Sequence, residues 1–275
     1  MSLPSLSPSP DPGPPEHVRA AFGVRTKTAE PLLHGVVWRC GDVMLRPVDG
    51  AVQAAWVAQT LDALRAKDIR VGRPVRSSDG RWVVGGWSAT RYLAGRPEPR
   101  YDEVVEASLR LHAATAPLPR PQFLADRHDL WSVAEAVAWG ERDAGDLPDR
   151  GGELFTHLVA ARRPVMLRSQ VVHGDLFGNV LFAGSAHPAV IDFVPFWRPP
   201  EWAAAVVVVD ALAWGGADLS LLHRWATLPE WPQVLLRALL FRVAAHAVHP
   251  LSTPESLAGL QRAMQLVSES GLSAQ

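Results

Sequence analysis

The stretch VVHGDLFGNVLFAGSAHPAVIDF, residues 171–193, places polar side chains between three apolar runs. His173, Asp175 and Asn179 follow the first run, and Asp192 stands inside the last one. An unpaired carboxylate inside an apolar strand is energetically costly, so Asp192 is expected to have a specific partner. The stretch therefore predicts a polar site at the ends of short strands.

The segments NVLF and AVIDF, separated by the turn-forming residues AGSAHP, predict a β-hairpin. If Phe182 pairs with Ala189, antiparallel register brings Asn179 opposite Asp192, with Cβ atoms roughly 4.5–5.5 Å apart. An amide oxygen and a carboxylate at that spacing suit a hard cation such as Mg²⁺. Asp175 precedes the hairpin and is placed to accept a proton from an incoming hydroxyl.

The segments HGDLFGN and VIDF resemble the catalytic signature of aminoglycoside phosphotransferases and choline-kinase-like enzymes. The resemblance implies that Asp175 is the catalytic carboxylate, that Asn179 and Asp192 bind Mg²⁺, and that His173 organises the loop. The segment ASLRLHAATA is similar to the family's helix that ends in Leu-His. The segment VVVVDALAW is similar to a later helix whose acid braces the catalytic loop, which implies a structural role for Asp210.

This family has a protein-kinase-like fold, and the resemblance extends loosely over residues 20–260, most closely to an actinobacterial branch. Short apolar segments with turn signals predict a small antiparallel sheet with one inserted helix, and longer periodic segments predict a mostly helical remainder. We therefore expect an α+β, two-lobed fold. Its expected parts are a disordered Pro/Ser-rich tail (1–15), a nucleotide-binding lobe (16–90) and a catalytic helical lobe (91–275).

The expected nucleotide-binding residues depart from the kinase pattern. The segment VMLRPV has Arg46 where kinases carry a phosphate-binding Lys, and Arg keeps the charge but not the shape of Lys. The following helix lacks an early Glu, so Gln53 or Gln59 is the expected hydrogen-bond partner of Arg46. The segment TRYLAGRPEP implies that Tyr92 and Leu93 flank the adenine of ATP, whose ring needs apolar walls.

The loop between the acid and the amide is also shorter than in the family. Three residues separate Asp175 from Asn179, where the family usually has four. Either the loop is tighter, or Asn179 is a turn residue rather than a metal ligand. Asp175 itself has an alternative role, as a turn residue that satisfies its own backbone.

Composition narrows the function classes. The chain has 275 residues, with 27 basic and 28 acidic side chains and a formal charge of −1, so nothing favours non-specific binding to nucleic acid or membranes. Cys40 is the single cysteine, which excludes an internal disulfide and fits a reducing cytoplasm. The N-terminal residues lack the apolar core of a signal peptide, and the longest apolar run is interrupted by Asp210 and too short to span a bilayer.

We therefore expect a cytoplasmic, ATP- and Mg²⁺-dependent phosphotransferase that acts on the hydroxyl of a small molecule. One alternative is a pseudokinase that binds a nucleotide or metabolite without catalysing a reaction, since the expected phosphate-binding residues depart from the kinase pattern. Another is metal-assisted hydrolysis by the same acids. The sequence has no dense acidic cluster that would favour a cationic antibiotic as acceptor, and it indicates no oligomeric state.

Overall fold

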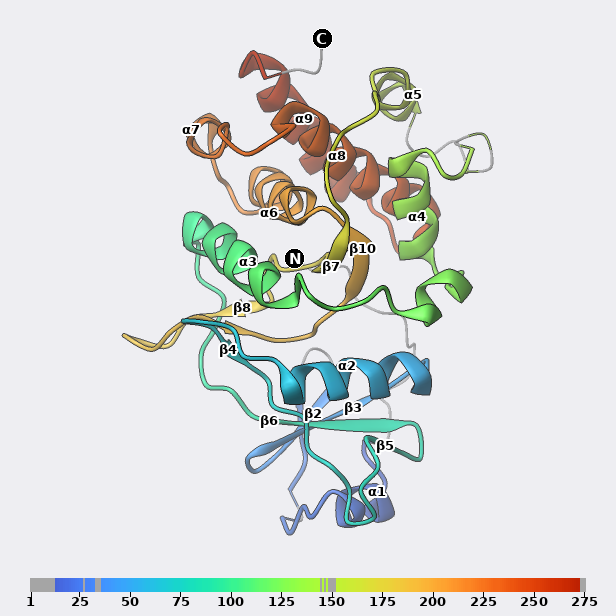
Figure 1. Ribbon diagram of the computed structural model, residues 1–275, viewed down its shortest axis with the longest axis vertical. Coiled ribbons are helices and arrows are strands. Elements are labelled where there is room, and N and C mark those ends of the chain that lie inside the picture. The colour runs from blue at the N-terminus through green and yellow to red at the C-terminus, as the bar shows by residue number, and fades with distance from the viewer. Residues whose placement is uncertain are drawn as a thin grey trace. The chain divides into compact units, whose positions relative to one another are not determined.

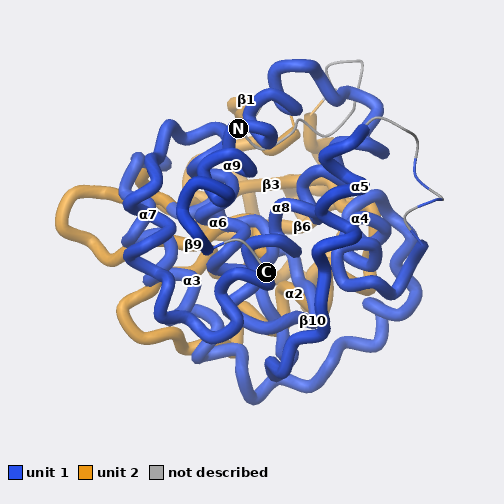
Figure 2. The backbone as a smooth tube through the Cα atoms, turned by 90° about the horizontal axis from the view of Figure 1, so that it is seen from above, with its two compact units in different colours: residues 1–2, 97–180, 194–275 blue, residues 3–96, 181–193 orange. Residues whose placement is uncertain are grey.

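The computed structural model describes most of the chain, namely residues 13–26, 28–32, 36–143, 145, 147 and 152–272. These residues form two compact units, which Figure 2 shows in different colours. The N-terminal unit extends to Arg96 and includes Leu181–Phe193. The C-terminal unit contains Pro97–Val180 and the described residues from Val194 onward. The chain therefore leaves the C-terminal unit after Val180 and returns to it at Val194.

Residues 1–12 of the expected tail lie outside the described residues. The residues that follow are packed, since Gly13 and Pro14 are buried. A Cβ at Gly13 would lie 3.1 Å from the ring of Trp38. Helix α1 (Glu16–Ala21) begins directly after this segment, with Pro15 as its N-cap.

The N-terminal unit contains an antiparallel five-stranded sheet with the order β1-β2-β3-β6-β5. Its strands are β1 (Glu30–Leu32), β2 (Val37–Cys40), β3 (Val43–Pro47), β5 (Val83–Val84) and β6 (Trp87–Arg91). Val18 and Phe22 pack with Leu45 in the core, and α2 (Ala51–Ala63) lies on the other face of the sheet (Figure 1). Because side chains alternate along a strand, Arg46 projects on the face opposite the buried Leu45.

One hairpin of this sheet does not use the turn-forming residues Ser78-Asp79-Gly80 to join its strands. That tight turn exists, but the paired strands are β5 and β6, joined at Gly85 and Gly86. Both glycines have positive φ, 56° and 78°. A two-residue loop of this kind matches the right-handed twist of the strands it joins, and it favours glycine at both positions.

A second, small sheet explains why Leu181–Phe193 belong with the N-terminal unit. Strand β4 (Arg70–Val71) pairs in parallel with β9 (Ala189–Val190), and the sheet order is β4-β9-β8. Strand β8 (Val180–Leu181) lies where the chain passes from one unit to the other. The arginine of β4, Arg70, also donates from Nε to the carbonyl of His187, at 2.8 Å.

The C-terminal unit is mostly helical and carries one two-stranded antiparallel sheet, β7 (Gln170–His173) with β10 (Pro195–Arg198). Its helices are α3 (Tyr101–Thr115), η2 (Gln122–Asp126), α4 (Leu130–Trp139), α5 (Gly152–Ala160), α6 (Pro200–Trp214), α7 (Leu219–Arg224), α8 (Trp231–Val248) and α9 (Pro254–Glu269). Helix α6 packs against α3, α8 and α9 (Figure 1), and its residues from Trp202 to Ala213 are all buried. Because α6 is surrounded by other helices, nearly all of its sides are apolar.

The sheet unit and the helical unit give the expected α+β class. The residue boundaries and the roles expected for the two lobes stay predictions. Among the described helices, none combines the length and the apolar character that a membrane span requires.

Candidate active site

The central loop, residues His173 to Asn179, begins where β7 ends. His173 is opposite Pro195 of β10, and Gly174 donates its backbone N–H to the carbonyl of Val194 at 3.1 Å. The ring of Phe196 lies directly against Gly174, so that a Cβ at this position would be 2.4 Å from the ring. The segment His-Gly-Asp therefore requires glycine in the middle, because any side chain would displace a buried aromatic ring.

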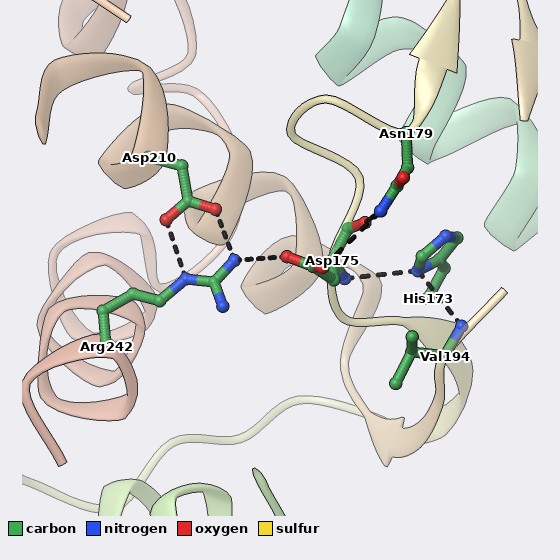
Figure 3. Close-up of polar contacts among 6 residues, drawn as sticks. All are labelled: His173, Asp175, Asn179, Val194, Asp210 and Arg242. Carbon is green, nitrogen blue, oxygen red and sulfur yellow. Dashed lines mark hydrogen bonds and ion pairs between the residues drawn. The ribbon is translucent and has the colours of Figure 1, made fainter. Parts of the chain in front are cut away.

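Two buried histidines set the conformation of this loop. His173 is fully buried, and its Nδ1 accepts the backbone N–H of Asp175 at 3.2 Å (Figure 3). The backbone N–H of His173 in turn donates to Nε2 of His112, on α3, at 2.9 Å. Burial, and secondarily the proximity of His173, lowers the pKa of His112 to about 3. His112 is therefore neutral, with an unprotonated Nε2 and a protonated Nδ1 near Ser108 Oγ (3.3 Å).

A tight turn follows the acid. The backbone N–H of Asn179 donates to the carbonyl of Leu176 at 3.0 Å, and Gly178 adopts a φ of 83° that favours glycine. The side-chain nitrogen of Asn179 donates to the backbone carbonyl of Asp175 at 2.8 Å (Figure 3). The shortened loop is thus a closed turn that brings Asn179 back to Asp175.

Asp175 shares a buried arginine with Asp210. Arg242, on α8, donates from Nε to Asp210 Oδ1 at 2.7 Å and from Nη2 to both Asp210 Oδ2 and Asp175 Oδ1, the latter at 2.8 Å (Figure 3). Burial raises the pKa of Asp210 to about 6, and Arg242 opposes this rise. Asp210 is consequently ionised at neutral pH and is the inner counter-ion of Arg242.

In the N-terminal unit, Arg46 of β3 forms an ion pair with Asp192. Both side chains are partly exposed, at 40% and 27%. The partner of Arg46 is therefore Asp192 rather than Gln53 or Gln59.

The structure corrects the expected ladder that placed Asn179 opposite Asp192. Strands β8 and β9 have two residues each, and neither Asn179 nor Asp192 belongs to them. Phe182 forms a bridge with Arg96. Asp192 follows the end of β9 with a φ of 52°, a left-handed conformation that is strained for a non-glycine residue. The chain turns sharply at Asp192 instead of continuing as a strand.

The residues expected to flank adenine follow β6. The backbone N–H of Tyr92 donates to the carbonyl of Asp42 at 2.8 Å, and the guanidinium of Arg39 lies 3.9 Å from the centroid of the Tyr92 ring. Tyr92 and Leu93 are half-buried. Their role toward a nucleotide stays a prediction.

The donor set fits Mg²⁺ in its chemistry. Among the described residues there is no group of three His, Cys, Asp or Glu side chains that could hold a metal ion. Asn179 belongs to the C-terminal unit and has an amide oxygen, and Asp192 belongs to the N-terminal unit and has a carboxylate. Oxygen ligands of these two kinds, together with phosphates and water, commonly hold Mg²⁺. The amide nitrogen of Asn179 donates to the carbonyl of Asp175, so the amide oxygen is the atom that would bind a cation.

Comparison with known proteins identifies the class. Residues 39–196 match the model of the phosphotransferase enzyme family, APH. The chain therefore belongs to this family. A search of curated proteins finds no match.

Three solved structures of phosphotransferases and kinases share the fold of this chain, which confirms the expected kinase-like fold. A choline/ethanolamine kinase family protein from Mesorhizobium loti aligns with a TM-score of 0.58 at 18% identity, over 94% of this chain and 98% of that one. Spectinomycin phosphotransferase APH(9)-Ia, in complex with ADP and spectinomycin, aligns with a TM-score of 0.56 at 11% identity, over 94% and 97%. A thermostable mutant of aminoglycoside phosphotransferase APH(4)-Ia, with ADP and hygromycin B, aligns with 0.58 at 12%, over 93% and 98%.

Sequence reasoning missed two residues of this arrangement. Arg242 stands in the apolar segment LLFRVAAHAV, and nothing in that segment indicates that its partners are Asp210 and Asp175. His112 was noted only as part of a helix motif, and its hydrogen bond to the backbone of His173 depends on the packing of α3 against β7.

Proposed function

We propose that this protein transfers the γ-phosphoryl group of ATP to a hydroxyl of a small molecule, with Mg²⁺ as cofactor. The observation that carries the proposal is the loop from His173 to Asn179, in which backbone and side-chain hydrogen bonds fix a partly exposed Asp175. Family membership and the ADP complexes of two structural neighbours support a nucleotide as phosphoryl donor.

Asp175 is the catalytic carboxylate in this proposal. Its side chain is 27% exposed, so it is accessible while its position is fixed from the inside. A carboxylate at this place accepts the hydrogen of an incoming hydroxyl and orients its oxygen for in-line attack on the phosphoryl group. His173 orients the loop and does not act as a base, because its Nδ1 accepts the backbone N–H of Asp175.

Asn179 and Asp192 are the proposed Mg²⁺ ligands, and Arg46 the proposed phosphate ligand. Bound Mg²⁺ and ATP would supply charge neutralisation and the transferred group. With Mg²⁺ bound, Asp192 would hold the cation instead of pairing with Arg46, and Arg46 would be available to the phosphates. A guanidinium can grip phosphate oxygens with two parallel hydrogen bonds, which suits this role.

Nucleotide-dependent stabilisation tests the proposed ligands. We expect ADP and Mg²⁺ together to raise the melting temperature of the wild type, and Asp192→Ala or Asn179→Ala to abolish the Mg²⁺-dependent part. Asp42→Ala is the matched control, because Asp42 also forms an ion pair with an arginine of the same sheet, Arg91. An equal Mg²⁺ effect in Asp192→Ala and Asp42→Ala would exclude Asp192 as a ligand.

The ion pair between Arg46 and Asp192 also supports a second candidate, a pseudokinase. In that case the pair persists, and a nucleotide or metabolite binds without chemistry. Nucleotide binding without turnover of any hydroxyl compound would favour this candidate. Release of phosphate without an added acceptor would instead indicate hydrolysis.

A further inference from the structure

Arg242 carries a charge in the interior of the helical unit. It lies in α8, where every residue from Gln233 to Ala247 is buried, and its side chain is 6% exposed. Burial opposes its charge, but Asp210 and Asp175 more than compensate and raise its pKa. The charge of Arg242 is thus balanced by these two carboxylates.

One carboxylate would be enough to neutralise Arg242. Asp210 is 1% exposed and takes two donors of the guanidinium, Nε and Nη2. The further bond from Nη2 to Asp175 Oδ1, at 2.8 Å, therefore does more than balance charge (Figure 3). It connects a rigid helix to the side chain of the loop carboxylate.

The guanidinium itself has little freedom to move. It lies 5.1 Å from the ring centroid of Phe241 and 5.8 Å from that of Trp131, on α4. Rings at this distance attract the cation and limit where it can lie. Of the two carboxylate oxygens of Asp175, Oδ1 is held at 2.8 Å by Arg242, whereas Asn179 Nδ2 is 3.5 Å from Oδ2.

We infer that Arg242 is a positioning residue for Asp175, which holds Oδ1 so that Oδ2 accepts the hydrogen of the acceptor hydroxyl. The role of Oδ2 rests on the proposed function. The positioning itself does not, because it concerns only the orientation of one side chain. A purely structural Arg242 would stabilise the fold without setting that orientation.

Helix α8 offers a matched control in Arg237. It is also buried, at 3% exposure, and its guanidinium lies 5.0 Å from the ring centroid of Trp139. It donates to the side chain of Gln233 at 2.6 Å and to the backbone carbonyl of Arg163. Arg237→Lys therefore makes the same chemical change in the same helix, at a residue whose partners are not carboxylates.

Crystal structures of the full chain carrying Arg242→Lys or Arg237→Lys test the positioning directly. Lysine lacks the fork that spans two carboxylates, so in Arg242→Lys we expect Asp175 to leave its side-chain rotamer. In Arg237→Lys the rotamer should be unchanged. An Asp175 with the wild-type rotamer in both variants would overturn the inference, whatever the activity of the protein.

Turnover separates this inference from the proposed function. Arg242→Lys should lower kcat by about 10–100-fold while KM for Mg²⁺·ATP changes by less than about 2-fold, because misplacement of a catalytic group affects the chemical step. Arg237→Lys should keep kcat within about 2-fold of the wild type, and equal losses in both variants would overturn the inference. If the wild type transfers no phosphate to any acceptor, the proposed function fails, and the crystal structures still decide the positioning.

A second variant covers the case that Arg242→Lys does not fold. Trp131→Leu removes one ring beside Arg242 without replacing any of the three charged residues Asp175, Asp210 and Arg242. We expect a displaced or disordered Asp175 carboxylate in its crystal structure. An ordered carboxylate in the wild-type rotamer would count against the inference.

Discussion

At the residue scale, each member of the His-Gly-Asp segment has its own physical cause. His173 supplies an acceptor for the backbone of Asp175, and Gly174 leaves room for the ring of Phe196. Asp175 is partly exposed and is held by Arg242. Packing and hydrogen bonding thus explain why histidine, glycine and aspartate stand at these three successive positions of the loop.

Gly174→Ala should therefore destabilise the protein. The added Cβ would meet the Phe196 ring at 2.4 Å, and forced overpacking of a core typically costs about 1–3 kcal/mol. Urea unfolding measures this loss. Gly50→Ala is the control, since a Cβ there meets only Gln53 at 3.9 Å, and its effect should stay below about 1 kcal/mol. Equal stability of the two variants would contradict the packing argument.

His112 predicts a pH dependence of stability. Its pKa is about 3 in the folded protein against 6.5 for the free group, so the unfolded chain binds the extra proton first as pH falls. The neutral histidine therefore contributes stability that is complete above pH 6.5 and is lost as pH falls toward 3. From pH 7 to 4.5 the loss should be about 2–3 kcal/mol.

The matched variant is His112→Gln, whose amide can accept the N–H of His173 but does not titrate. Asp210 acts in the opposite direction, because its pKa is raised to about 6 and it binds a proton more tightly in the folded state. The comparison with His112→Gln removes this contribution, which both proteins share. Identical pH profiles of unfolding free energy would show that His112 is not buried in its neutral form.

At the element scale, α6 and α8 are joined by charge as well as by apolar packing. Arg242→Met leaves the buried carboxylate of Asp210 without a counter-ion, which should cost about 3–5 kcal/mol in unfolding free energy. Addition of Asp210→Asn to this variant should recover part of the loss. A double variant as unstable as the sum of both single changes would contradict the pairing.

The ion pair between Arg46 on β3 and Asp192 after β9 leads to a prediction for nucleotide binding in the absence of metal. Asp192→Asn frees Arg46 to bind phosphate, so the affinity for ADP in EDTA should rise several-fold. Asp42→Asn, which breaks the exposed pair with Arg91, should leave it unchanged. Isothermal titration calorimetry measures both, and a weaker affinity in Asp192→Asn would mean that Arg46 does not serve the phosphates.

The sequence predicts those helices and strands that are determined by residues close together in the chain. The small antiparallel sheet with one inserted helix, α2, is an example, because turn residues bound its short apolar segments. The parallel pairing of β4 with β9 was not predicted, because it joins residues far apart in the chain. Asp192 was expected inside a strand, since its neighbours are apolar, but the chain leaves β9 before it.

At the scale of the whole molecule, the family match ends at residue 196, whereas Asp210 and Arg242 lie beyond it. The central loop is thus held by helices α6 and α8 that follow the matched segment. Asp210 was expected from its apolar surroundings and from the family resemblance. Arg242 had no support from the family resemblance, and its partners Asp175 and Asp210 come from distant parts of the chain.

The most direct test of the account is phosphoryl transfer itself. The full chain is incubated with Mg²⁺, ATP labelled at the γ-phosphate and a panel of small hydroxyl compounds, and label on the acceptor is measured. We predict labelled acceptor with the wild type, and a loss of about 100-fold or more in Asp175→Asn with nucleotide binding retained. Equal transfer by Asp175→Asn, or no transfer by the wild type to any acceptor, would contradict the assignment.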